Sequence, residues 1–224
     1  MLELLLDADG LLAVHKPAGL LVHPSRMDAH EHDTLLTRAE AQFGQRLQPL
    51  HRLDKGTSGL LLLARDSATA ARAGAWVRDG LVIKHYLALV RGWPAADAGL
   101  IDHPLARDPE RPSQGQPQLE AQTRWCCLRR LAWPLVTRPG FADTRAALLR
   151  IEPLQGRRHQ IRRHCKHAGH PLIGDATHGK GALNRALAAH LGLSRLWLHA
   201  WRLQLPDGRR LQADPGPEWN QFIA

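Results

Sequence analysis

The sequence predicts an α+β fold whose core is a largely antiparallel mixed sheet. Segments of strand length outnumber those of helical length, and the helical segments fall between them at irregular intervals instead of alternating with them. The 224 residues include no long linker, repeat or low-complexity tract. We therefore expect a single domain over residues 1–224.

Turn residues and apolar runs place the elements of the first part of the chain. Residues 2–6 and 11–14 predict a β-hairpin, and residues 23–33 are typical of a loop. Asp33 is the expected cap of a helix over residues 34–43. The elements expected next are a buried strand over residues 60–63, a helix over 68–79 capped by Asp66 or Ser67, and a strand over 81–91.

The second part of the chain predicts further strands around one basic helix. A hairpin is expected near residues 100–105, with strands over 118–128 and 146–152 on either side of a connection around 133–143. The elements expected after the basic segment are a helix over residues 183–191, a strand over 196–205, a hairpin turn at 206–208 into residues 209–213, and a closing helix over 217–224.

The charge balance favours a polyanionic partner. The formal net charge is +9 and the isoelectric point is about 10.4. Hydrophobic residues make up 44% of the chain, which argues against an intrinsically disordered protein. Charge alone does not choose between RNA, DNA and anionic lipid.

The N-terminus and the cysteines favour a cytoplasmic location. The first residues include acids where a secretory signal needs positive charge, and no apolar run approaches the length of a membrane span. Three cysteines, with Cys126 and Cys127 adjacent, provide no disulfide framework. We expect a reducing compartment and no membrane partner.

A polar loop that runs directly into an apolar strand carries the first candidate site residue. Residues 51–60 have the sequence His-Arg-Leu-Asp-Lys-Gly-Thr-Ser-Gly-Leu. A loop held by a rigid strand commonly positions catalytic groups, which makes Asp54 a candidate. The alternative is that Asp54 only closes a turn, because aspartate is a common turn residue.

Tyr86 is the only tyrosine in the chain, and it lies in the strand predicted over residues 81–91. It shares a face with Lys84, Ala88 and Val90. From the residues alone, a tyrosine packed in the core with its hydroxyl hydrogen-bonded is the usual interpretation.

The most basic segment follows Gly156. No acid lies between Glu152 and Asp175, and the apolar residues Ile161 and Cys165 recur at helical spacing. An arginine beside this stripe could turn inward to a carboxylate while its neighbours stay in water. The alternative interpretation is a solvated basic helix face.

Three of these segments together resemble the RluA-type family of pseudouridine synthases. The loop at residues 51–60 is similar to the family's first signature, and Lys-His-Tyr-Leu-Ala-Leu-Val-Arg-Gly at 84–92 is similar to its second. Gly-Arg-Arg-His-Gln-Ile-Arg-Arg-His at 156–164, with His-Pro-Leu-Ile-Gly-Asp at 170–175, resembles the third. The opening strand and loop at residues 14–24 also fit, so the resemblance spans about residues 3–205.

The resemblance implies one catalytic domain without an N-terminal RNA-binding extension, built on a bent mixed sheet split by a central cleft. It implies isomerisation of a uridine in RNA to pseudouridine, a rearrangement that requires no cofactor and no metal. Asp54, Tyr86 and Arg162 take the catalytic positions of the three motifs. An ionised carboxylate in a site that excludes water needs a cationic partner, so we predict an Asp54–Arg162 salt bridge.

RNA is the expected partner, and the target uridine must leave its stack to be reached. Arg52 is the family's candidate to fill the vacated space. The further residues predicted to bind RNA are Lys16, Lys55, Arg157, Arg158, Gln160, Arg163 and Lys166.

Within the family, the residues around 25–33 look most like the members that modify tRNA, which implies a uridine of the position-65 type. Ribosomal RNA is the alternative substrate, and a non-catalytic RNA-binding protein is the alternative class. We expect a monomer.

A zinc site is a further alternative for the basic segment. His and Cys residues crowd there, but their spacing matches no common zinc pattern. The residues concerned are His159, His164, Cys165, His167 and His170.

Overall fold

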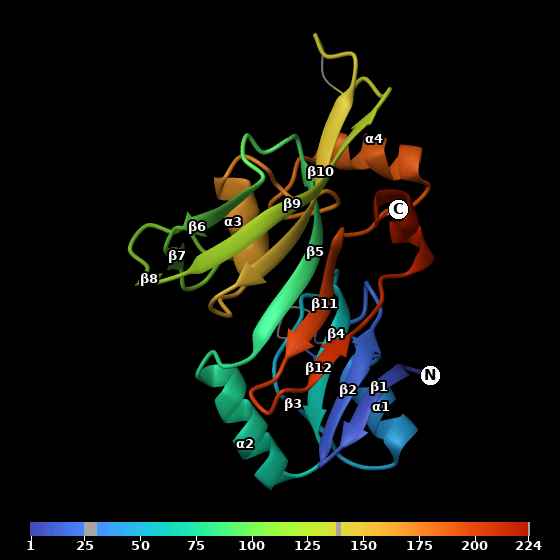
Figure 1. The fold of residues 1–224 in the computed structure, drawn as a ribbon, viewed down its shortest axis with the longest axis vertical. Helices are drawn as coiled ribbons and strands as arrows, with labels where there is room; N and C mark the ends of the chain where they lie inside the picture. The colour runs from blue at the N-terminus through green and yellow to red at the C-terminus, as the bar shows by residue number, and fades with distance from the viewer. Residues whose placement is uncertain (25–30, 138–139, 224) are drawn as a thin grey trace. The chain divides into compact units, whose positions relative to one another are not determined.

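The computed structural model describes residues 1–24, 31–137 and 140–223, which form two compact units (Figure 1). The first unit comprises Met1–Lys84 with His199–Pro215, and the second comprises His85–Leu198 with Gly216–Ala224. Each unit has its own strands and helices.

The sheet of the first unit is mixed. Its strands lie in the order β1-β2-β4-β11, with β3 beside β4 and β12 beside β11. All of these pairs are antiparallel except β4 and β11, which run parallel from the pairing of Ser58 with His199. The strands are β1 Glu3–Ala8, β2 Leu11–Lys16, β3 Gln48–Pro49, β4 Ser58–Ala64, β11 Leu198–Gln204 and β12 Arg210–Gln212.

β4 forms the centre of this unit. All seven of its residues are buried, and α2 packs against it. Because the strand is covered on both faces, it is a continuous leucine run instead of an alternating pattern. The buried strand predicted over residues 60–63 is confirmed and begins two residues earlier, at Ser58. The predicted N-terminal hairpin and the turn at 206–208 are confirmed as well.

The two helices of the first unit are capped by side chains. In α1 (Leu35–Phe43) the cap is Thr34, whose hydroxyl accepts from the amide of Thr37. The predicted cap, Asp33, is wrong, because its carboxylate instead accepts two hydrogen bonds from Arg38. In α2 (Ser67–Arg78) Asp66 is the cap, which was one of the two predicted alternatives.

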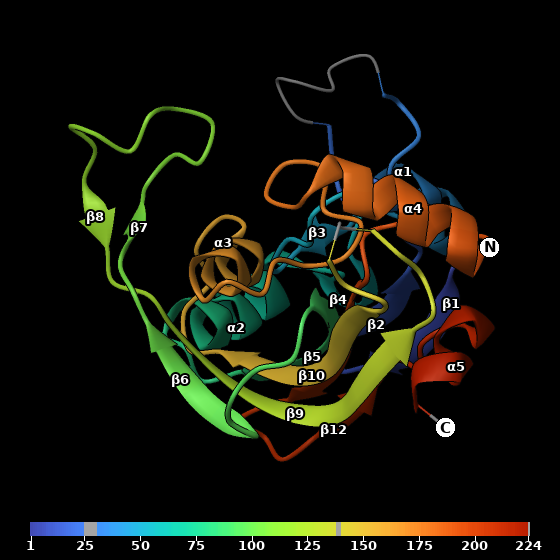
Figure 2. The same cartoon turned by 90° about the horizontal axis from the view of Figure 1, so that it is seen from above.

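The sheet of the second unit is antiparallel, in the order β5-β10-β9-β6. The strands are β5 Ile83–Arg91, β6 Ala98–Asp102, β9 Gln122–Trp133 and β10 Thr144–Pro153. A separate pair is formed by β7 (Leu105–Ala106) and β8 (Gln118–Leu119). Figure 2 shows this pair and its loop standing clear of the larger sheet.

Two predictions for this region are wrong. The hairpin expected near residues 100–105 does not form, because β6 pairs with β9 and β7 pairs with β8. The strand expected over residues 118–128 is split into β8 and the longer β9.

The helices of the second unit are α3 (Gln160–His167), α4 (Gly181–Leu191), the 3-10 turn η1 (Pro217–Trp219) and α5 (Asn220–Ile223). The closing segment packs by its aromatic rings. Trp197 meets Trp219 and Phe222 edge-on, with ring centroids 5.2 and 5.0 Å apart. All three side chains are at most 1% exposed, so the chain's last turns complete the core of this unit.

The α+β class and the largely antiparallel mixed sheet are confirmed. Parts of three predicted segments lie outside the described residues, namely residues 25–30 of the first loop, 138–139 of the connection after β9, and Ala224. In the described ranges, no helix has the length and apolar character that a membrane crossing requires.

Candidate active site

Asp54 lies in the tight loop between β3 and β4. The amide of Thr57 donates to the Asp54 carbonyl at 3.0 Å, which closes the turn. The Lys55 carbonyl accepts from the amide of Gly19 at 2.9 Å. The loop is therefore tied both to itself and to the segment that follows β2.

Lys16 strengthens this tie from inside the protein. Its side chain is fully buried, and its ammonium group donates to the carbonyls of Leu20 at 2.7 Å, Pro17 at 3.0 Å and Lys55 at 3.1 Å. A buried ammonium group is stabilised by such acceptors. We correct the prediction that Lys16 binds phosphate at the surface, because the structure uses its charge to hold the Asp54 loop in place.

His51, at the start of the loop, is an uncharged acceptor. Its Nε2 atom accepts from the amide of Leu62 at 3.2 Å. Burial lowers the pKa of His51 to about 3, and the nearby charge of Lys84 acts in the same direction. The imidazole therefore stays neutral at physiological pH and joins the loop to β4.

The remaining predicted residues of this loop lie at the surface. Arg52 is exposed, as a residue that enters an RNA stack must be. Lys55 is also exposed and forms an ion pair with Glu31. Both positions are compatible with contact to RNA, which stays a prediction.

Tyr86 lies in β5 opposite Ile151 of β10. Its side chain is almost buried, at 9% exposed. The strand prediction for this residue is confirmed, and its place beside a bound uracil stays a prediction.

Arg162 turns inward from α3 to a carboxylate, which is Asp175. Its Nε donates to Oδ2 at 2.7 Å and its Nη2 donates to Oδ1 at 2.9 Å. The two residues are 8% and 1% exposed. This bidentate geometry fixes the plane of the guanidinium group. The predicted Asp54–Arg162 pair stays a prediction.

Asp175 was not among the residues selected from the sequence. Its Oδ1 also accepts from the amides of Thr177 at 2.9 Å and His178 at 2.8 Å. Burial alone raises the pKa of Asp175, but the hydrogen bonds from Arg162 and from the His178 amide outweigh it and hold the pKa below its ordinary value. The available signal was its place as the first acid after the long basic segment.

The basic segment divides into buried and exposed members. Gln160 is 4% exposed, and its amide group donates to the Gln122 carbonyl at 2.9 Å and to the Thr123 hydroxyl at 3.2 Å. We correct the prediction that it binds RNA, because it joins α3 to β9. The partly or fully exposed members are Arg157, Arg158, Arg163 and Lys166.

All three of these arginines already have partners within the protein, and Arg163 donates to the Ala106 carbonyl at 2.9 Å. Arg157 donates to the Glu120 carbonyl at 3.0 Å. Arg158 forms ion pairs with Asp108 and Glu110 of the loop between β7 and β8. RNA would compete with the two acids for Arg158.

The histidines considered for zinc have other contacts. His164 is fully buried between the Thr123 hydroxyl at 2.8 Å and the His103 carbonyl at 2.9 Å. Over the part of the chain that the structure describes, no group of three or more His, Cys, Asp or Glu side chains gathers as a metal site.

The mixed sheet, the anchored aspartate loop and the arginine-rich helix agree with the class of enzyme expected from the sequence, one that modifies a nucleotide in RNA. The chain belongs to the RNA pseudouridylate synthase family, whose profile matches residues 10–167.

Two curated relatives agree with this assignment. The chain is 39% identical to tRNA pseudouridine synthase C of Vibrio cholerae, over 91% of this chain and 85% of the relative. It is 41% identical to tRNA pseudouridine synthase C of Pasteurella multocida, over 90% of this chain and 84% of the relative.

Solved structures show the same fold. Human RNA Pseudouridylate Synthase Domain Containing 1 superposes with a TM-score of 0.74 at 28% identity, covering 97% of this chain and 84% of the human one. The fold of Human RNA Pseudouridylate Synthase Domain Containing 4 is also similar, with a TM-score of 0.73 at 24% identity, over 98% of this chain and 92% of that one.

Proposed function

We propose that this member of the family isomerises a specific uridine of tRNA to pseudouridine, of the position-65 type expected from the sequence. The assignment to tRNA rests on the sequence identity, over most of both chains, to relatives named tRNA pseudouridine synthase C. We further propose that the chain acts as a cytoplasmic monomer.

The reaction exchanges one bond of the uracil for another. The N1–C1′ bond breaks, the base turns, C5 bonds to C1′, and the proton on C5 is lost as N1 gains one. Breaking the glycosidic bond develops positive charge at the sugar, which an ionised carboxylate stabilises or traps. We assign this task to Asp54, acting at C1′ as a nucleophile or at C2′ as a base.

The Arg162–Asp175 pair supports the role that we assign to Arg162. Asp175 occupies Nε and Nη2, so the fork geometry of the guanidinium group directs Nη1 away from Asp175. We propose that Nη1 is the donor that pairs with Asp54 and keeps it ionised. Tyr86 then packs beside the uracil ring and excludes water.

Binding of RNA requires the uridine to leave its stack, at a cost of roughly a few kcal/mol. We propose that the exposed guanidinium of Arg52 enters the vacated space. Lys55, Arg157, Arg158, Arg163 and Lys166 are the proposed phosphate contacts.

The substrate is tested by deleting the gene in the source strain and comparing cellular RNA with that of the parent. Carbodiimide labelling followed by primer extension marks each pseudouridine by a stop. We expect the loss of one stop in a tRNA, restored by the wild-type gene and not by Asp54→Asn. Loss of a ribosomal RNA stop would replace the tRNA assignment, and an unchanged pattern would contradict the activity.

A further inference from the structure

A pocket of about 450 Å³ lies in the second unit, between α3 and the β7–β8 pair. Five of the residues that line it are basic or histidine, and none of those lining residues is acidic. The five are His103, Arg163, Lys166, His167 and His178. A concave site of this size with convergent cationic groups suits an anionic ligand.

We propose that this pocket binds a backbone phosphate of the RNA and binds it more tightly when one of its stacked histidines is protonated. The inference rests on the proposed function, because RNA supplies the phosphate.

Arg163 and Lys166 form the permanently charged side of the pocket. They lie three residues apart on α3 and therefore on one face of the helix. The Arg163 guanidinium donates to the Ala106 carbonyl at 2.9 Å, which fixes it against β7. Lys166 is exposed at the next turn. One anchored and one exposed cation can hold a phosphate from two directions.

His103 and His167 form the titratable side. Their rings stack with centroids 3.7 Å apart and an interplanar angle of 12°. Burial lowers the pKa of His103, and the neighbouring His167 and Arg163 lower it further. Two stacked imidazolium rings would repel each other. Without an anion, protonation of His103 is therefore disfavoured.

Two permanent cations and two histidines surround the stack. Arg163, His164 and Lys166 face it from α3, and His178 faces it from the loop after α3. Burial lowers the pKa of His164 as well. The nearest acid on the His178 side, Asp175, is engaged by Arg162.

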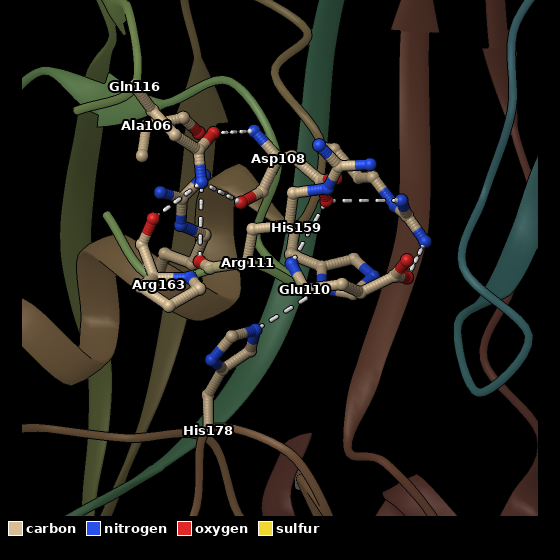
Figure 3. A network of polar contacts seen from close by, with 10 residues as sticks. Ala106, Asp108, Glu110, Arg111, Gln116, His159, Arg163 and His178 are labelled. Atoms are coloured by element: carbon tan, nitrogen blue, oxygen red, sulfur yellow. Dashed lines mark hydrogen bonds and ion pairs between the residues drawn. The ribbon is translucent and has the colours of Figure 1, made fainter. Parts of the chain in front are cut away.

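The acids of the β7–β8 loop are likewise engaged. Figure 3 shows Gln116 closing this loop, with its side-chain amide donating to the Asp108 carbonyl at 2.9 Å. Asp108 and Glu110 pair with Arg158. His178 is held by a contact between its Nε2 and His159 Nδ1 at 3.2 Å. Because these acids are paired with Arg158, they do not neutralise the cations of the pocket, which can attract an anion.

Binding and protonation are therefore linked. A bound phosphate stabilises the imidazolium form of His103. Binding of phosphate therefore raises the pKa of this histidine, and the complex takes up a proton. RNA affinity should then rise as the pH falls, by at most about tenfold per pH unit for each proton taken up.

The test measures binding of the full chain to an unmodified tRNA transcript by fluorescence anisotropy, at about pH 6 and about pH 8, across the range in which histidine titrates. We expect the wild type to bind several-fold more tightly at the lower pH, and we call the quotient of the two affinities the pH ratio. The double variant His103→Asn/His167→Asn should lose most of this pH ratio. The variant His190→Asn, an exposed histidine on α4, is the matched control and should keep it.

Loss of the pH ratio in the double variant supports the pocket, and an unchanged pH ratio overturns it. Nitrogen-15 spectra of the histidines with inorganic phosphate show whether free phosphate alone binds in the pocket. Chemical-shift changes at His103 and His167 only with tRNA would assign the site to the RNA backbone. No change with either phosphate or tRNA would overturn the proposal. Pseudouridine formation by the wild type is measured in parallel. Its absence would reject the proposed function while the binding comparison still decides the pocket.

Discussion

Arg162 and Asp175 show what a single buried pair contributes to this protein. Both side chains are removed from water, and the carboxylate accepts from two backbone amides as well as from the arginine. Such a pair adds little net stability over apolar residues, but loss of one partner leaves an uncompensated buried charge. The same contact orients the Arg162 guanidinium group, which we propose pairs with Asp54.

Asp175→Asn should lower the free energy of unfolding by about 3–5 kcal/mol, because Arg162 loses its buried counter-charge. Denaturant unfolding measures this. The matched control is Asp207→Asn, which removes a partly exposed partner of Arg209 and should cost less than about 1 kcal/mol. Equal losses in the two variants would contradict the account.

The pH dependence of this pair has a definite sign. Because the pKa of Asp175 lies below its ordinary value of 3.8, its contribution is present above that value and is lost as the pH falls through the folded-state pKa. The wild type should therefore lose more stability on acidification than Asp175→Asn does.

At the residue scale, the sequence showed which polar residues to consider but not whether each one is buried or exposed. Lys16 and Gln160 were grouped with the basic residues predicted to bind RNA, yet both are buried and anchor their neighbours. Asp175 was missed because its partner lies 13 positions earlier, across the end of a helix. The sequence marks Asp175 as the first acid after the basic segment, but it does not show which residue the carboxylate contacts.

At the scale of elements, the contact between β4 and β11 explains one glycine of the first motif. Gly59 has a φ of +109° and lies beside Ala200. A Cβ atom at Gly59 would lie 2.2 Å from the Ala200 carbonyl oxygen. Only glycine has both the backbone freedom and the size for this strand pair.

Gly59→Ala should therefore lower the free energy of unfolding by about 2–4 kcal/mol, since backbone strain adds to a steric clash. Gly74→Ala is the matched control. Gly74 lies inside α2, where an added Cβ atom would meet no other described atom within 4 Å, so alanine there should stabilise by about 0.5–1 kcal/mol. Thermal unfolding compares the two, and a neutral Gly59→Ala would contradict this packing.

Helices and strands with a clear hydrophobic pattern and clear turn residues could be predicted from the sequence, and the others could not. The leucine strand, the N-terminal hairpin and α2 follow from patterning and turn residues. β7 and β8 have only two residues each, and the pairing of β6 with β9 is set by long-range contacts. Adjacent cap candidates, as at Asp33 and Thr34, cannot be separated by type alone.

At the scale of the whole molecule, the proposed catalytic set draws on both units. Asp54 belongs to the first, whereas Tyr86 and Arg162 belong to the second. The ordered motifs and the family resemblance predicted this set, which composition and periodicity could not. The net charge of +9 predicted an anionic partner without naming it.

The most direct test of the central claim is pseudouridine formation in a tRNA transcript by purified wild-type chain and by Asp54→Asn, with binding measured on the same RNA. Asp207→Asn, in the same unit, is the control. We expect Asp54→Asn to lose at least about a thousandfold in rate while its affinity stays within about threefold of the wild type. Activity near the wild-type rate in Asp54→Asn would contradict the assignment of Asp54 as the carboxylate that acts on the uridine.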